Sequence, residues 1–497
     1  MIDLTLNEER LQRSAQRARE RGIIIPTYAQ MRDPGKVPAP IVEKLGDIGL
    51  WDLHPLNLFR ITWKNEPTAQ GGGYGNVNYI ELPPELTGVS ARIIALVGKW
   101  FPTGAHKVGA TFGCLAPRLV TGQFDPTFHK AVWPSTGNYC RGGAYNSNLL
   151  GCESIAILPE GMSRERFEWL EKVAGEIIAT PGCESNVWEI FQKCIELKAT
   201  RDNVMIFNQF DEPGNHLWHY EVTGHAMEEV LQAELNGGRD GQRYAGVVLT
   251  SGSAGTMGCG DYLKELYPGS KLVASEALQC PTLLENGFGG HRIEGIGDKH
   301  VPWIHNARNT DMVTGIDDED CMRLVRLFNE DAGHAYLQSQ GVPTDLVERL
   351  DTLGISGIAN MLSAIKFAKY YELTGSDVVL TVFTDSMELY QSRLRELNEA
   401  RGAYDATDAA IDYHARLLGI KTDHTLELRH QDRKRIHNLK YFTWIEQLGK
   451  SVEELDAQWH DYPGYWDRIH AMVPAIDERI VAFNERVGLL SELGGSA

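Results

Sequence analysis

Lys107 is the side chain of this sequence best placed for covalent chemistry. An apolar run at residues 91–97 precedes it and predicts a β-strand, and residues 108–115 follow as a short helix that we expect Pro117 to end. The lysine therefore lies at a strand-to-helix junction, among small and apolar neighbours. Burial there lowers the pKa of an amine, so that the neutral form that attacks a carbonyl exists near pH 7. In isolation, a lysine at a helix start is more often a solvated charge.

A glycine-rich loop at residues 251–256 follows a second apolar run, 245–249, and precedes another predicted helix. Its glycines let the backbone approach a ligand closely, so the loop is suited to cradle a phosphate at a helix start. The expected contacts are Gly252, Ser253, Ala254, Gly255 and Thr256. The loop lacks the G-x-G-x-x-G spacing of dinucleotide-binding proteins. It only approaches the G-x-S-x-G spacing of a hydrolase nucleophile, and we can assign no histidine and acid partners to it.

Two further polar stretches follow predicted strands. Residues 135–138, Ser-Thr-Gly-Asn, come after the strand at 130–133 and open a helix, where successive amides suit a substrate carboxylate. Residues 384–386, Thr-Asp-Ser, come after the strand at 378–383, at the end of a sheet where α/β proteins bind ligands. Both stretches are also compatible with simple helix caps, and the residues alone leave this open.

One buried lysine and two anion-binding loops are what an enzyme that uses pyridoxal 5′-phosphate requires. The lysine holds the cofactor aldehyde as a Schiff base, while the loops bind the cofactor phosphate and the carboxylate of a small amino-acid substrate. His216 and His219 have a spacing that suggests a metal. No cysteine or carboxylate spacing completes a ligand set, so we expect structural histidines and no metal.

The composition favours an ordinary soluble protein of two or three domains. The chain has 497 residues and a formal charge of −19, so nucleic acid and anionic membranes are disfavoured as partners. Its 8 cysteines form no CxxC pair, which is typical of reduced thiols. The N-terminus has no apolar signal core, and no stretch is long enough to span a membrane, so we expect a cytoplasmic protein.

From about residue 91 onward, short apolar runs alternate with amphipathic helices, which is typical of α/β proteins with parallel sheets. The expected strands are 91–97, 130–133, 154–158, 176–179, 245–250, 271–275 and 378–383. The expected helices include 163–174, 220–234 and 257–267. Residues 396–497 differ in character, being charged and mostly helical.

In this order the motifs resemble the fold-type II pyridoxal phosphate enzymes, the family of cysteine synthase, cystathionine β-synthase and the tryptophan synthase β-subunit. Residues 103–107, Thr-Gly-Ala-His-Lys, are similar to the lysine motif of the tryptophan synthase β-subunit. Residues 135–138 and 252–256 are similar to the asparagine loop and the phosphate loop of cysteine synthase. Further similar stretches are 208–224, 291–302, 354–357 and 384–386. The similarity covers roughly residues 54–395.

The resemblance implies an α/β protein of two domains, each a mostly parallel sheet flanked by helices, as in the tryptophan synthase β-subunit. It also implies a homodimer. The expected division is an N-terminal extension at 1–53, a large cofactor-binding domain at 54–135 and 230–395, a small mobile domain at 136–229, and a helical C-terminal extension at 396–497.

The resemblance also assigns cofactor contacts to single residues. Lys107 would hold the cofactor and transfer the Cα proton, and Asn138 would bond its phenolic oxygen. The phosphate would lie on Gly252 to Thr256, helped by His106. The pyridine nitrogen would face one of three hydroxyl groups, those of Ser386, Thr384 or Ser356, of which Ser386 is preferred.

The substrate carboxylate would be held by Ser135, Thr136, Gly137 and Asn138. Ser135 stands where tryptophan synthases have an indole-activating glutamate, so tryptophan formation is disfavoured. The implied reaction is β-replacement or β-elimination on a serine- or cysteine-like L-amino acid through an aminoacrylate intermediate, with replacement favoured. The alternatives are a dehydratase- or desulfhydrase-type lyase that gives a keto acid and ammonia, a catalytically silent partner subunit, and a binding protein without a Schiff base.

Overall fold

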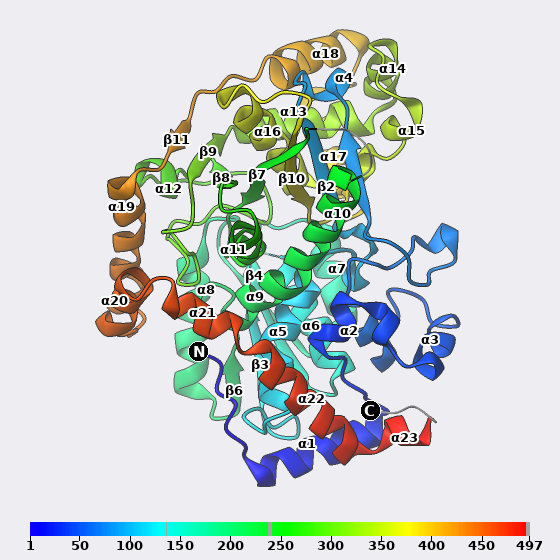
Figure 1. The fold of residues 1–497 in the computed structure, drawn as a ribbon, viewed down its shortest axis with the longest axis vertical. Coiled ribbons are helices and arrows are strands. Elements are labelled where there is room, and N and C mark those ends of the chain that lie inside the picture. Colours follow the sequence, from blue (N-terminus) through cyan, green and yellow to red (C-terminus); the bar gives the residue numbers. More distant parts are fainter. Residues whose placement is uncertain (136, 237–240, 494–497) are drawn as a thin grey trace.

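The computed structural model describes residues 1–135, 137–236 and 241–493. Its strands form two sheets, and Figure 1 shows the larger one in the upper half and the smaller one below it. The larger sheet has the order β1-β2-β10-β7-β8-β9-β11, and the smaller sheet has the order β5-β4-β3-β6. The strands are β1 Tyr79–Leu82, β2 Arg92–Val97, β3 Lys130–Pro134, β4 Glu153–Pro159, β5 Glu176–Thr180, β6 Val204–Ile206, β7 Arg243–Thr250, β8 Lys271–Ala277, β9 Met312–Ile316, β10 Asp377–Phe383 and β11 Thr425–Glu427.

Most neighbouring strands run parallel, which confirms the predicted α/β class. The small sheet is parallel throughout, and in the large sheet only the edge strands β1 and β11 pair in the antiparallel sense. The seven expected strands all form, and β1, β6, β9 and β11 are additional to them. Strand β3 pairs with β4 in the small sheet although it precedes residue 135, so the exact domain boundaries stay a prediction.

Helices surround both sheets. They are α1 Glu8–Arg21, α2 Tyr28–Arg32, α3 Ala39–Leu45, α4 Pro84–Thr87, α5 Lys107–Leu119, α6 Asn138–Leu149, α7 Arg164–Val173, α8 Val187–Thr200, α9 Pro213–Trp218, α10 Gly224–Asn236, α11 Met257–Leu266, α12 Thr282–Glu285, α13 Asp318–Asn329, α14 Asp331–Ser339, α15 Thr344–Val347, α16 Ile355–Tyr370, α17 Gln391–Arg401, α18 Ala406–Ile411, α19 His430–Lys440, α20 Val452–His460, α21 Gly464–His470, α22 Val473–Val487 and α23 Leu489–Glu492.

Strand β2, in the large sheet, shows why a buried parallel strand has a continuously apolar sequence. All six of its residues are buried. Successive side chains point to opposite faces, so Ile94 and Leu96 join one hydrophobic cluster while Ile93, Ala95 and Val97 join another. Parallel strands with helices on both faces are therefore buried on both sides and lack the alternation of a half-exposed strand.

Helix α5 is longer than expected, because Pro117 lies inside it and does not end it. The helix runs to Leu119. A proline near the end of a helix removes only one backbone donor, here the one that would reach the Gly113 carbonyl, so the last turn can still form. Two other carbonyls of this turn accept from side chains. Arg118 Nη1 donates to the Cys114 carbonyl at 2.8 Å, and Thr121 Oγ1 donates to the Pro117 carbonyl at 2.8 Å.

The two terminal extensions meet. In Figure 1 the orange and red helices run from α19 down and across the small sheet to α22, which lies beside the blue α1. Asn484 of α22 bonds both the N–H and the carbonyl of Ile25. Within the part of the chain that the structure describes, no helix has the length and apolar character needed to cross a bilayer.

Candidate functional site

The turn before α5 fixes the position of Lys107. Thr103 and Gly104 both have positive φ angles, 72° and 71°, which a threonine adopts only under constraint. A Cβ atom on Gly104 would lie 2.6 Å from the ring of Trp51, so only glycine fits there. Trp51 belongs to the N-terminal extension, which therefore borders the site.

Lys107 is half-buried at the first turn of α5. Burial lowers the pKa of its amine to about 8, and the charge of Asp298 acts against this shift. Burial in turn raises the pKa of Asp298 to about 8, opposed by the charge of Lys107. Oδ2 of Asp298 is buried and has no hydrogen-bond partner among the described residues. The site thus places an acid and an amine together, both of which titrate near physiological pH.

Asn138 begins α6 and connects it to the end of β10. Its Nδ2 donates to Oδ2 of Asp385 at 2.5 Å, and the Tyr390 hydroxyl donates to the same oxygen at 2.6 Å. A Cβ atom on Gly142, one turn later, would lie 3.1 Å from the carbonyl carbon of Lys107. Helix α6 therefore packs directly on the backbone of Lys107 and brings Asn138 to the same corner.

The expected carboxylate loop is only partly described. Oγ of Ser135 accepts a hydrogen bond from the Gly137 amide at 3.0 Å, and the Ser135 amide donates to the Ile157 carbonyl. Thr136 lies outside the described residues. A Cβ atom on Gly137 would lie 2.2 Å from Nη1 of Arg166, so a buried guanidinium borders this loop.

Arg141, on the first turn of α6, was not foreseen from the sequence. It is 1% exposed, yet its Nε and Nη1 atoms have no hydrogen-bond partner and it forms no ion pair within the described ranges. Its guanidinium lies 4.7 Å from the ring centroid of Trp169 and 6.0 Å from that of Trp51. Burial, followed by the charge of Arg166, lowers the pKa of Arg141 to about 10. Buried donors without partners mark a place where an anionic ligand would be stabilised.

The glycine-rich loop lies between β7 and α11, as expected. Ala254 has a φ of 61°, and Oγ of Ser253 accepts a hydrogen bond from Nδ2 of Asn215 at 3.1 Å. A Cβ atom on Gly255 would lie 2.0 Å from Oδ1 of the same Asn215. Upstream, the Ser251 carbonyl accepts from the Gly297 amide at 3.0 Å, which joins this loop to the segment of Asp298.

His106 is fully buried beside Lys107. Its ring centroid lies 5.4 Å from that of Trp63 and 5.0 Å from that of His219. Burial holds its pKa well below the usual value, so the imidazole is neutral. Both ring nitrogens lack a hydrogen-bond partner among the residues that are described.

The three hydroxyl candidates for the pyridine nitrogen lie near the end of β10. The Thr384 carbonyl accepts from the His106 amide at 3.4 Å. The Asp385 carbonyl accepts from the Gly354 amide at 3.0 Å, next to the helix start that carries Ser356. Ser386 and Ser356 are both buried. Asp385, which lies inside a motif singled out from the sequence but had no role assigned, is the residue that contacts Asn138.

The residues of this corner fit pyridoxal phosphate. Buried polar atoms without partners are rare in folded proteins and call for a ligand or water. Here they gather around one lysine of lowered pKa: Thr103 Oγ1, both ring nitrogens of His106, Asn138 Oδ1, Asp298 Oδ2 and Asp385 Oδ1. This pattern suits a polar cofactor with a phosphate, a phenolic oxygen and a pyridine nitrogen.

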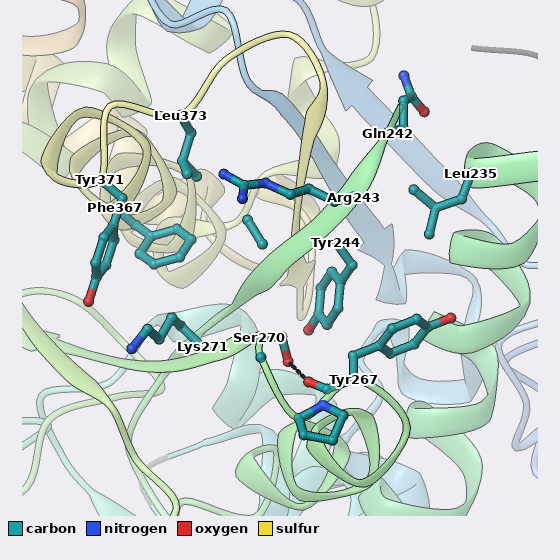
Figure 2. A pocket seen from close by; sticks show the side chains of 13 residues that line it. Leu235, Gln242, Arg243, Tyr244, Tyr267, Ser270, Lys271, Phe367, Tyr371 and Leu373 are labelled. Carbon is teal, nitrogen blue, oxygen red and sulfur yellow. Dashed lines mark hydrogen bonds between the residues drawn. The ribbon is translucent and has the colours of Figure 1, made fainter. Parts of the chain in front are cut away.

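A large surface cavity lies elsewhere. Its volume is about 610 Å³. Figure 2 shows side chains that line it, with Arg243 and Tyr244 at the start of β7 and Tyr371 beyond α16. Ligands of parallel α/β sheets bind at the carboxyl ends of the strands, whereas this cavity lies at an amino end. It is therefore not the site that Lys107 belongs to.

Comparisons with known proteins agree with this geometry. The family model described as "Pyridoxal-phosphate dependent enzyme" matches residues 99–342. A cysteine synthase of Staphylococcus aureus is 30% identical over 262 residues, which is 52% of this chain and 75% of that protein. A probable cysteine synthase of Bacillus subtilis is 28% identical over 292 residues, covering 59% of this chain and 85% of the relative.

A solved structure shares the fold. A hydrogen sulfide-producing enzyme of Fusobacterium nucleatum superposes with a TM-score of 0.52 at 23% identity, over 68% of this chain and 92% of that one. The expected two-domain fold-type II architecture is thereby confirmed. On these similarities, the chain belongs to the family of pyridoxal-phosphate-dependent enzymes related to cysteine synthase.

Proposed function

We propose that this protein catalyses β-replacement or β-elimination on a serine- or cysteine-like L-amino acid, with pyridoxal 5′-phosphate attached to Lys107. The observation that carries the proposal is the half-buried Lys107, whose pKa is lowered to about 8, at the meeting point of the asparagine loop and the segment of Asp298. The names of the cysteine synthase relatives support the reaction class.

Lys107 has two tasks in this mechanism. Its Nζ holds the cofactor and then, once free, accepts the proton from Cα of the substrate. When bound, the cofactor withdraws electrons from Cα, so that the Cα–H bond can ionise and the bond from Cβ to the leaving group can break. When it is ionised, Asp298 favours the protonated state of Lys107 and so helps it to retain the proton that it takes.

The second half of the reaction determines the product. In replacement, a nucleophile adds at Cβ, and Lys107 returns the proton to Cα. In elimination, water instead releases a keto acid and ammonia. The outcome depends on how well the closed site excludes water. We expect replacement, a lyase or transferase classification, a homodimer and a cytosolic location.

For the cofactor and substrate contacts we propose the residues that the sequence predicts. Gly252, Ser253, Ala254, Gly255 and Thr256 would hold the phosphate with His106, and Asn138 would bond the phenolic oxygen through the N–H of Nδ2 that Asp385 does not use. Ser386 remains the preferred partner of the pyridine nitrogen. Ser135, Thr136 and Gly137 would bind the substrate carboxylate.

The function is tested by mixing the purified, cofactor-loaded protein with serine, O-acetylserine, O-phosphoserine and cysteine. We expect at least one of them to change the visible absorption of the cofactor. Addition of sulfide or a thiol should then yield a new amino acid, measured by mass spectrometry. Pyruvate and ammonia without a second substrate would establish elimination. A cofactor spectrum that responds to none of the four, but does respond to threonine or a D-amino acid, would refute the proposed substrate class.

Arg141 is expected to bind an anionic group of the substrate. In an Arg141→Leu variant, KM should rise about 10- to 100-fold, because a charge-assisted hydrogen bond contributes about 1.5–3 kcal/mol. Steady-state kinetics measure this, and Arg141→Lys should recover part of the loss. The matched control is Arg164→Leu on the neighbouring helix, whose side chain is 77% exposed. An unchanged KM in Arg141→Leu would limit Arg141 to packing against Trp169.

A further inference from the structure

His216 does not pair with His219 as their spacing suggested. Nδ1 of His219 lies 3.0 Å from Oγ1 of Thr223. Nε2 of His216 points the other way, to Nε2 of His470 at 3.0 Å and Oδ2 of Asp261 at 3.7 Å. The potential ligand atoms of His216, Asp261 and His470 all lie within 4.8 Å of one another. The three side chains come from α9, α11 and α21, so sequence spacing could not reveal the cluster.

Two of these separations, 3.0 Å and 3.7 Å, are close to those between the ligands of a metal ion. Zinc lies about 2.0–2.2 Å from imidazole nitrogen and carboxylate oxygen, which places ligand atoms about 3 to 3.6 Å apart at the usual angles. The three side chains are almost fully enclosed, with exposures of 0% for His216, 3% for Asp261 and 8% for His470. Enclosed ligands of mixed imidazole and carboxylate type suit a divalent transition metal.

The surroundings hold Asp261 in place and set a carboxylate beside His470. Oδ2 of Asp261 accepts from Nδ2 of Asn306 at 2.9 Å, and Oδ1 accepts from Nδ2 of Asn309 at 2.5 Å. On the far side of the His470 ring, Nδ1 lies 3.6 Å from Oε1 of Glu265. A carboxylate beside the ring of a ligating histidine is common in zinc sites.

A cavity of about 300 Å³ opens onto the cluster and gives it an entry path and room for a fourth ligand. It is lined by Asp261, Glu265, Asn309, Tyr462, Asp467 and His470, among others. Lys264 also borders it, but its charge is engaged by Asp311 at 2.8 Å. The free charges at the entrance are therefore acidic, which favours a cation.

We propose that His216, Asp261 and His470 bind one zinc ion, with water from the cavity as the fourth ligand. The ion joins the C-terminal extension, through α21, to the two core helices α9 and α11. Helix α9 continues to His219, which packs against His106 beside Lys107. The metal thus fixes the element behind the catalytic lysine and has no part in the chemical step.

The test uses the cofactor-loaded enzyme after chelator treatment. Titration with ZnCl2, followed by calorimetry and elemental analysis, should show one ion per chain and a rise in Tm. His470→Gln and His216→Gln should each weaken zinc binding at least about tenfold and abolish the rise in Tm. The matched control His460→Gln removes an exposed histidine of the same extension and should bind zinc like the wild type.

Cobalt gives a second measurement that needs no variant. Co²⁺ in place of zinc should give the intense visible absorption of a four-coordinate site in the wild-type protein. If the 3.0 Å contact is only a hydrogen bond between two neutral imidazoles, the wild-type protein will take up neither ion. That result, or equal zinc binding by wild type and His470→Gln, would overturn the proposal.

Discussion

Lys107→Ala is expected to lose covalent cofactor attachment and to turn over substrate about 10²–10⁴ times more slowly, the usual contribution of a group that transfers a proton. Nζ of Lys107 is the half-buried amine at the first turn of α5, and alanine removes both the attachment point and the acceptor for the Cα proton. Borohydride reduction followed by peptide mass spectrometry measures the attachment, and steady-state assays measure the turnover.

The matched control is Lys299→Ala. Lys299 is exposed and lies next to Asp298, so its removal changes a nearby charge without touching the site. It should keep the reducible cofactor link and most of the activity. A reducible link that persists in Lys107→Ala would show that another lysine holds the cofactor.

Asp298→Asn is expected to move the pH dependence of cofactor capture to lower pH. The charge of Asp298 raises the pKa of Lys107, against the larger effect of burial that lowers it to about 8. Without that charge the pKa of Lys107 falls further, so the neutral amine is available at lower pH. The rate of cofactor attachment to the cofactor-free protein, measured from pH 6 to pH 9, reports this shift. Turnover should fall about 10²-fold, because the proton on Lys107 is less well held.

Lys299→Ala again serves as the control, since a solvent-exposed charge is screened and should shift the profile little. A profile with the same midpoint in Asp298→Asn and wild type would mean that Asp298 does not act on Lys107. An unchanged turnover would assign Asp298 a purely structural position in its loop.

Most of the predicted strands are buried on both faces, but burial alone did not decide which strands were found. Strand β5 was predicted although most of its residues are only partly buried, and β9 was missed although all five of its residues are buried. Strand β2 is continuously apolar and was foreseen, because a fully buried parallel strand leaves that pattern. Strand β6 has three half-buried residues and β11 has three partly exposed ones, too few for a recognisable pattern. Helix α5 was foreseen but its end was wrong, since a proline in the last turn removes only one backbone donor and does not stop the helix.

The residues of the site also fall into those that the sequence predicted and those that it missed. Lys107 and Asn138 were found because each lies at a junction between two local patterns in the chain. Asp298 and Arg141 were missed, because what marks them is burial without a partner, and this depends on segments far apart in sequence. Asp298 has one local signal in the sequence. It lies directly after a glycine in residues 291–302, the stretch that resembles cysteine synthases.

The edges of the large sheet limit how two chains can associate. β1 and β11 close the two edges as short antiparallel strands, of four and three residues. Short edge strands offer little free backbone for another chain to extend the sheet, a feature that also protects against aggregation. A dimer of this protein would therefore have to use surfaces other than the edges of the large sheet. Solvent exchange at the backbone amides of β1 and β11 should then stay the same on dilution from dimer to monomer.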